Sequence, residues 1–208
     1  MRDILELVLV LSIICLVAAL SLAKVYDITK EPIALQKRLA RLQTINAVLP
    51  PHDNEPDKNT VQVSLDAQGN EGGKVAARTA DGSRTKTGAV LVYRGLKGDH
   101  VSGVAFEMKS LGFGGEVGVM IGLDPNGIIR GIEITSMNET PGLGARVAEP
   151  AFKQQFQGKS LNVTHFKVKK DGGDFDQVTG ATITPRAVVQ AVKNGLEFYQ
   201  KHKESIIQ

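Results

Sequence analysis

An uninterrupted apolar run near the N-terminus is the feature that most restricts how this 208-residue chain folds. Residues 7–23, LVLVLSIICLVAALSLA, contain no charged side chain, and extending the run back to Ile4 adds only Glu6 as a charge. Twenty helical residues rise about 30 Å, which matches the hydrocarbon core of a bilayer. The run therefore predicts a transmembrane helix within residues 1–25.

A cleaved signal peptide is the alternative interpretation of the same run. The stretch LSLAKV has the small residues of a cleavage site. However, the run is longer than the ~7–15 apolar residues usual in a signal peptide, and Arg2 is accompanied by Asp3 and Glu6 rather than by further basic residues. We favour an uncleaved anchor.

The charges on either side of the run bear on its orientation. Arg2 lies on the N-terminal side, whereas the C-terminal side carries Lys24, Lys30, Lys37, Arg38 and Arg41. Basic residues favour the cytoplasmic side of a membrane. Taken alone, this count predicts a cytoplasmic domain after the anchor.

Composition excludes several classes of function. The net charge is +3, the basic residues are scattered and there is no tryptophan, so the chain lacks the clustered basic face of a nucleic-acid-binding protein. Cys15 is the only cysteine, which excludes a disulfide within the chain and a cysteine-based metal site. The four histidines have no metal-like spacing. We expect neither nucleic acid nor metal as a ligand.

The region after the anchor divides into three parts. In residues 26–50, apolar residues recur in steps of three and four, which predicts a membrane-proximal helix that ends at Pro50 and Pro51. Residues 51–88 are polar and rich in Asp, Asn and Gly, which predicts an irregular segment with one short strand at VQVSL. Residues 89–208 form the main predicted domain.

Short strands separated by turn signals open the main domain. AVLVYRG and VSGVAFEM flank LKGDH, and GEVGVMIGL and GIIRGIEI flank DPNG, so we expect two antiparallel hairpins. EPAFKQQFQGKSL has the spacing of a short helix that ends at Gly158, and HFKVKK is expected to return to the sheet.

A last helix completes the predicted domain. Thr184 as N-cap and Pro185 at the first helical position are expected to begin it. Its predicted buried stripe comprises Val188, Val192, Leu196 and Tyr199. The predicted fold class is α+β, with one N-terminal transmembrane helix, an antiparallel sheet and packed helices.

The stretch DQVTGATITP, residues 176–185, is the first candidate site. Gly180 and Ala181 leave room for a ligand near the backbone, and Thr179 and Thr182 add hydroxyls just before a helix. A helix N-terminus with free N–H groups is an anion site. A tight turn with a threonine cap explains the same residues, and both interpretations remain open from the residues alone.

The stretch NETPGLGARV, residues 138–147, is the second candidate. This loop directly follows a predicted strand, and its backbone is suited to lie against a flat ring. A loop that needs glycines for positive φ explains it equally well.

In their order along the chain, these motifs resemble those of one family. The signal D-x-x-[ST]-G-A-[ST], read by a transferase that esterifies the phosphate of FMN to the last hydroxyl, is matched by DQVTGAT. The loop ETPGLG, the hairpin GFGGEVGVMIGLDPNG and a single anchor followed by LP match as well. Nearly the whole chain resembles the G subunit of the Rnf ion-translocating electron-transport complex. The C subunit of the sodium-translocating NADH:quinone reductase is a related family.

The resemblance assigns roles to individual residues. It implies that Thr182 carries FMN through a phosphoester bond and that the chain has no catalytic residue of its own. The implied recognition signal is Asp176, Thr179, Gly180 and Ala181, and the residues implied to touch the flavin are Glu139, Thr140, Gly142 and Leu143.

The resemblance also implies a function and partners. The chain is expected to be an FMN-binding electron carrier in a complex that couples ferredoxin and NAD electron transfer to ion translocation. Its expected partners are the other subunits, a flavin transferase and the inner membrane, with the FMN-binding domain on the periplasmic side. That placement opposes the charge count. The alternatives are the equivalent quinone reductase component and a membrane-anchored FMN-binding regulatory domain.

Overall fold

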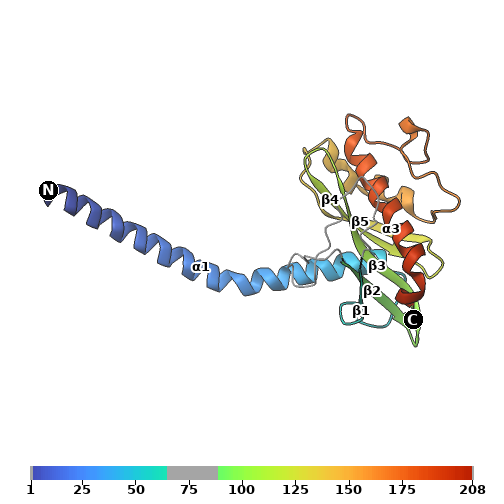
Figure 1. Ribbon diagram of the computed structural model, residues 1–208, viewed down its shortest axis with the longest axis horizontal. Coiled ribbons are helices and arrows are strands. Elements are labelled where there is room, and N and C mark those ends of the chain that lie inside the picture. Colours follow the sequence, from blue (N-terminus) through green and yellow to red (C-terminus); the bar gives the residue numbers. More distant parts are fainter. Residues whose placement is uncertain (1, 65–88, 208) are drawn as a thin grey trace. The chain divides into compact units, whose positions relative to one another are not determined.

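A computed structural model describes residues 2–64 and 89–207 of the chain. The chain forms two compact units, one that extends to Arg41 and one that begins at Leu42. Figure 1 shows the first as a helix and the second as a sheet with a long helix against it.

One helix, α1 (Arg2–Val48), contains both the expected anchor and the expected membrane-proximal helix. Pro32 lies inside it, and it ends two residues before Pro50, where the chain cannot continue as a helix. Among the described residues, α1 is the one helix long and apolar enough to cross a membrane, and its apolar stretch is not buried. Ser12 and Ser21 donate their hydroxyls to carbonyl oxygens one turn earlier, at 2.7 and 2.8 Å, so neither needs an outside partner.

The second unit contains a five-stranded antiparallel sheet in the order β1-β2-β3-β4-β5. The strands are β1 (Thr60–Ser64), β2 (Ala89–Lys97), β3 (His100–Leu111), β4 (Glu116–Leu123) and β5 (Ile129–Ser136). This confirms the predicted hairpins and, as far as Ser64, the short strand at VQVSL, which pairs with β2 at the sheet edge. The remainder of the predicted irregular segment, residues 65–88, lies outside the described residues. In the DPNG turn, Asp124 Oδ1 accepts hydrogen bonds from the N–H groups of Asn126 (2.9 Å) and Ile128 (3.0 Å).

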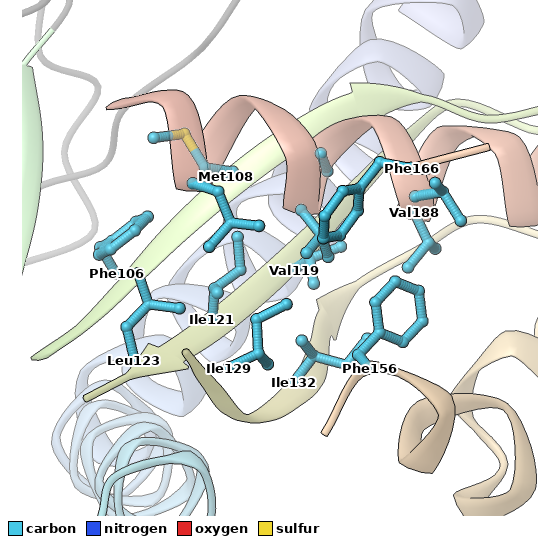
Figure 2. Packing of buried hydrophobic residues seen from close by; sticks show 14 of the residues in the cluster. Phe106, Met108, Val119, Ile121, Leu123, Ile129, Ile132, Phe156, Phe166 and Val188 are labelled. Atoms are coloured by element: carbon cyan, nitrogen blue, oxygen red, sulfur yellow. The ribbon is translucent and has the colours of Figure 1, made fainter. Parts of the chain in front are cut away.

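Helix α3 (Ile183–Ile207) covers one face of the sheet, and the main core lies between them. Figure 2 shows Phe106, Met108, Val119 and Ile121 of the sheet with Val188 of α3. The four residues of the predicted α3 stripe are all buried. The Tyr199 hydroxyl donates to the Pro125 carbonyl oxygen at 3.0 Å, and burial, with a smaller contribution from Asp124, raises the Tyr199 pKa to about 12.

The opposite face of the sheet packs against the end of α1. Ile45 and Val48 of α1 are buried, together with Leu49. Their partners on the sheet are Tyr93, Ala105 and Met120. Gly122 of β4 permits this contact, because a Cβ there would overlap the Val48 carbonyl oxygen and lie 2.5 Å from the Val48 carbonyl carbon.

Short helical turns join the sheet to α3. They are η1 (Gly144–Ala148), α2 (Pro150–Lys153), η2 (Gln154–Phe156) and η3 (Lys169–Asp171). The helix expected around Phe152 and Phe156 is present as α2 and η2, and Gly158 follows with φ of 74°. Both phenylalanines are buried, and the Phe156 ring stacks on Phe175 with centroids 4.4 Å apart.

The expected return of HFKVKK to the sheet is wrong. Phe166 and Val168 are buried as in a strand, but they pack in the aromatic cluster around Phe175. Their backbone bonds are local: Lys167 N–H donates to the His165 carbonyl oxygen, and Lys169 N–H donates to that of Phe175. The alternation of buried Phe166 and Val168 with exposed Lys167 therefore comes from a loop that folds back on itself and not from a strand of the sheet.

Candidate functional site

A cavity of about 240 Å³ brings the two candidate motifs together. Its walls come from three places: the tip of the β3–β4 hairpin, the loop after β5, and the turn that begins α3. The lining residues are Phe113, Glu139, Thr140, Leu143, Gly144, Gly180, Ala181, Thr182, Ile183 and Thr184.

A tight turn forms the wall nearest α3. Ala181 N–H donates to the Val178 carbonyl oxygen at 3.1 Å. Gly180, between them, has φ of 81°, a backbone angle that residues other than glycine rarely adopt. A Cβ at Gly180 would also lie 3.0 Å from Leu143 Cδ2. Gly180 therefore serves both the turn and the close approach of the second motif.

Helix α3 begins earlier than expected. Its first residue is Ile183, and the Thr182 carbonyl oxygen accepts a hydrogen bond from Arg186 N–H at 3.2 Å. Thr184 and Pro185, predicted as N-cap and first helical residue, lie inside the first turn and are buried. Half-buried Thr182 thus stands directly at the helix N-terminus, where free N–H groups and the helix dipole favour an anion.

The loop after β5 forms the facing wall. Leu143 N–H donates to the Thr140 carbonyl oxygen at 3.2 Å across Pro141 and Gly142, and Gly142 has φ of 76°. This Pro-Gly turn presents Leu143, which remains 44% exposed, to the cavity.

Three of the sequence-predicted residues lie outside the cavity wall. Gly142 makes the turn just described, and Thr179 is exposed in the other turn. Asp176 is exposed as well, with its carboxylate 2.7 Å from Lys169 Nζ and its N–H donating to Gln155 Oε1 at 2.6 Å.

Phe113 is the main lining residue that the sequence interpretation missed. It lies in GFGG at the hairpin tip and exposes 74% of its surface. A large aromatic residue between glycines in a predicted hairpin turn is a signal for a binding residue. The core does not bury a side chain at such a turn, so core packing does not explain the residue. Gly144 and Ile183 were also not anticipated as lining residues.

An ion pair fixes the first turn of α3 to η3. Arg186 Nε and Nη2 donate to the two carboxylate oxygens of Asp171, both at 2.5 Å. The hydrogen bond from Arg186 lowers the pKa of the Asp171 carboxyl, and the same bond raises the pKa of the guanidinium. These two hydrogen bonds link the ends of the segment that leads from η3 to the first turn of α3.

Comparison with known proteins agrees with the geometry of the cavity. Residues 112–197 match the FMN-binding domain family, and this range contains every residue of the cavity wall. The structure is similar to NqrC of Shewanella oneidensis, with a TM-score of 0.59 and 19% identity over 83% of this chain and 98% of that one. It is also similar to the C subunit of the Na(+)-translocating NADH-quinone reductase of Parabacteroides distasonis, with a TM-score of 0.56 and 21% identity over 81% and 92% of the two chains. These two structures show the fold.

Sequence relatives cover almost the whole chain. The G subunit of the ion-translocating oxidoreductase complex of Cereibacter sphaeroides is 35% identical over 96% of this chain and 85% of its own length. The protein of that name from Aliivibrio fischeri is 35% identical over 96% of this chain and 91% of its own length. This chain therefore belongs to the family of G subunits of ion-translocating oxidoreductase complexes.

Proposed function

We propose that this chain is the membrane-anchored flavoprotein component of an ion-translocating oxidoreductase complex and that its FMN is esterified to Thr182. The observation that carries the proposal is the cavity in which Thr182, at the N-terminus of α3, faces the loop after β5. A denatured chain that keeps its flavin fluorescence after small molecules are removed supports the proposal. A denatured chain without flavin contradicts it.

The lining residues suit FMN. Phe113, Leu143 and Ile183 offer apolar surface for a flat ring system, and the helix N-terminus offers N–H groups for a phosphate. The cavity is smaller than the roughly 300–1,000 Å³ typical of small-molecule sites, so part of the flavin would remain accessible. Such access suits an electron carrier.

The remaining residues of the recognition signal suit a different role. Asp176 and Thr179 are exposed and lie outside the cavity wall. A flavin transferase can contact both during maturation, while Gly180 and Ala181 shape the cavity. This division supports transferase recognition by Asp176 and Thr179 rather than flavin contact.

The bound flavin would supply the redox chemistry. The chain's own residues would position it: Thr182 as the attachment point, and Leu143 and Phe113 as apolar walls. The relatives covering most of this chain at 35% identity favour the G subunit assignment over the quinone reductase component.

Replacing Leu143 with alanine tests the loop wall. We expect the flavin to stay attached but its absorption spectrum or midpoint potential to shift, because an apolar wall beside the ring is removed. Val163→Ala is the matched control, since Val163 is exposed and outside the cavity wall. Equal spectra and potentials for Leu143→Ala and the unmodified protein would show that the loop does not contact the flavin ring.

We further propose that the FMN-binding domain lies on the extracytoplasmic side of the inner membrane. The five basic residues after the apolar run oppose this, but a large following domain is translocated largely regardless of charge. The transferase signal supports it, since the family's flavin transferase acts outside the cytoplasm. A reporter that is active only after export, fused after Gln208, should be active. Activity of only a cytoplasmic reporter at the same position would show the opposite topology.

A further inference from the structure

We infer that Glu139 is a positioning residue that holds Phe113 at the cavity by binding the tip of the β3–β4 hairpin. This inference rests on the proposed FMN site and assigns Glu139 a role that differs from direct contact with the flavin. The tip is the stretch Gly112 to Gly115, and Glu139 lies in the loop after β5.

One carboxylate oxygen of Glu139 serves two consecutive peptide groups of the tip. Oε1 accepts hydrogen bonds from Phe113 N–H at 2.9 Å and from Gly114 N–H at 3.2 Å. The backbone of Phe113 is therefore fixed by a side chain 26 residues later in the chain.

The tip needs such an anchor because its own residues do little to order it. Phe113 is 74% exposed, so core packing does not hold its ring. Its neighbours Gly112, Gly114 and Gly115 have wide conformational freedom, and one bond from Gly112 N–H to the Gly115 carbonyl oxygen closes the turn at 2.8 Å.

The tip and the loop are packed too closely to admit side chains between them. A Cβ at Gly112 would overlap Glu139 Oε1, and a Cβ at Gly114 would overlap the Asn138 carbonyl oxygen. Asn138 adds a third link, since its Nδ2 donates to the Gly114 carbonyl oxygen at 3.3 Å. The glycines of GFGG thus permit the docking that Glu139 secures.

The second carboxylate oxygen faces the cavity wall. Oε2 lies 2.6 Å from the position that a Cβ at Gly144 would take, and the Thr184 hydroxyl oxygen lies 2.7 Å from the same position. Glu139 therefore stands between the tip that carries Phe113 and the residues that line the cavity beside α3. Its place lets it set how far Phe113 stands from those walls.

A pair of conservative variants separates the reach of Glu139 from its charge. Glu139→Gln keeps an oxygen at the same reach without the charge, whereas Glu139→Asp keeps the charge on a shorter side chain. In the flavin-loaded, full-length protein in detergent, iodide quenching of flavin fluorescence measures access to the ring. We expect Phe113→Ala to increase quenching, Glu139→Asp and Glu139→Ala to increase it equally, and Glu139→Gln to resemble the unmodified protein.

The double variant Phe113→Ala, Glu139→Ala completes the test. If Glu139 acts through Phe113, the double variant is quenched no more than Phe113→Ala alone. Additive increases, an unchanged Glu139→Asp, or a Glu139→Gln as accessible as Glu139→Ala would each overturn the inference. So would a Phe113→Ala protein with unchanged quenching. Absence of flavin from the unmodified chain would instead refute the proposed function itself.

Discussion

We expect Thr182→Ala to yield a chain that carries no flavin after denaturation, whereas the unmodified protein should give a fluorescent band in a denaturing gel. The reason is chemical: alanine has no hydroxyl to form the phosphoester. The expected effect is a complete loss, larger than that of any change in the cavity wall. Thr182→Ser is the matched control, because serine keeps the hydroxyl at the same place and should retain the fluorescent band.

Two other threonines, Thr179 and Thr184, are the alternative attachment points if the prediction fails. A fluorescent Thr182→Ala band would move the attachment to Thr179 or Thr184. Thr184 is only 1% exposed within the first turn of α3, while Thr179 is exposed but outside the cavity wall. Attachment at either would require a different arrangement of the flavin from the one proposed.

Gly122→Ala is expected to cause the largest loss of stability among the substitutions considered. The new methyl group would overlap the backbone carbonyl of Val48, which a side-chain rotation cannot relieve. Overpacking of this kind costs about 1–3 kcal/mol, occasionally more, and a backbone clash should place Gly122 at the upper end. Urea unfolding of the detergent-solubilised chain, followed by circular dichroism, measures the free energy of unfolding.

Gly131 is the matched control for Gly122. The two glycines pair across β4 and β5, but a Cβ at Gly131 would lie 3.5 Å from Val48 Cα, an ordinary contact. Gly131→Ala should change the free energy of unfolding by less than about 1 kcal/mol. Equal losses for the two variants would show that the end of α1 does not pack on the sheet as described.

The hairpins and the long helices were predictable because their signals are local. Short apolar segments on either side of DPNG specify a turn and its two strands, and the four residues of the α3 stripe repeat at helical spacing. The motifs before α3 and after β5 were predictable as candidates in the same way. That they share one cavity depends on the packing of α3 across the sheet, which spacing does not reveal.

The failures share a physical cause, which is tertiary contact that overrides a local pattern. Phe166 and Val168 alternate like strand residues, yet the aromatic cluster around Phe175 buries them in a loop. Thr184 resembles an N-cap in sequence but is buried inside α3. Phe113 lies at the cavity because two loops 26 residues apart in sequence dock on each other, a contact that the GFGG stretch alone does not predict.

The intact mass of the purified full-length protein tests the central claim most directly. A phosphoester to Thr182 predicts a mass above that of the polypeptide by one FMN less one water. Fragmentation of the peptide that contains residues 176–186 should place this addition on Thr182. A polypeptide of unmodified mass, isolated from cells that make the flavin transferase, would contradict covalent attachment.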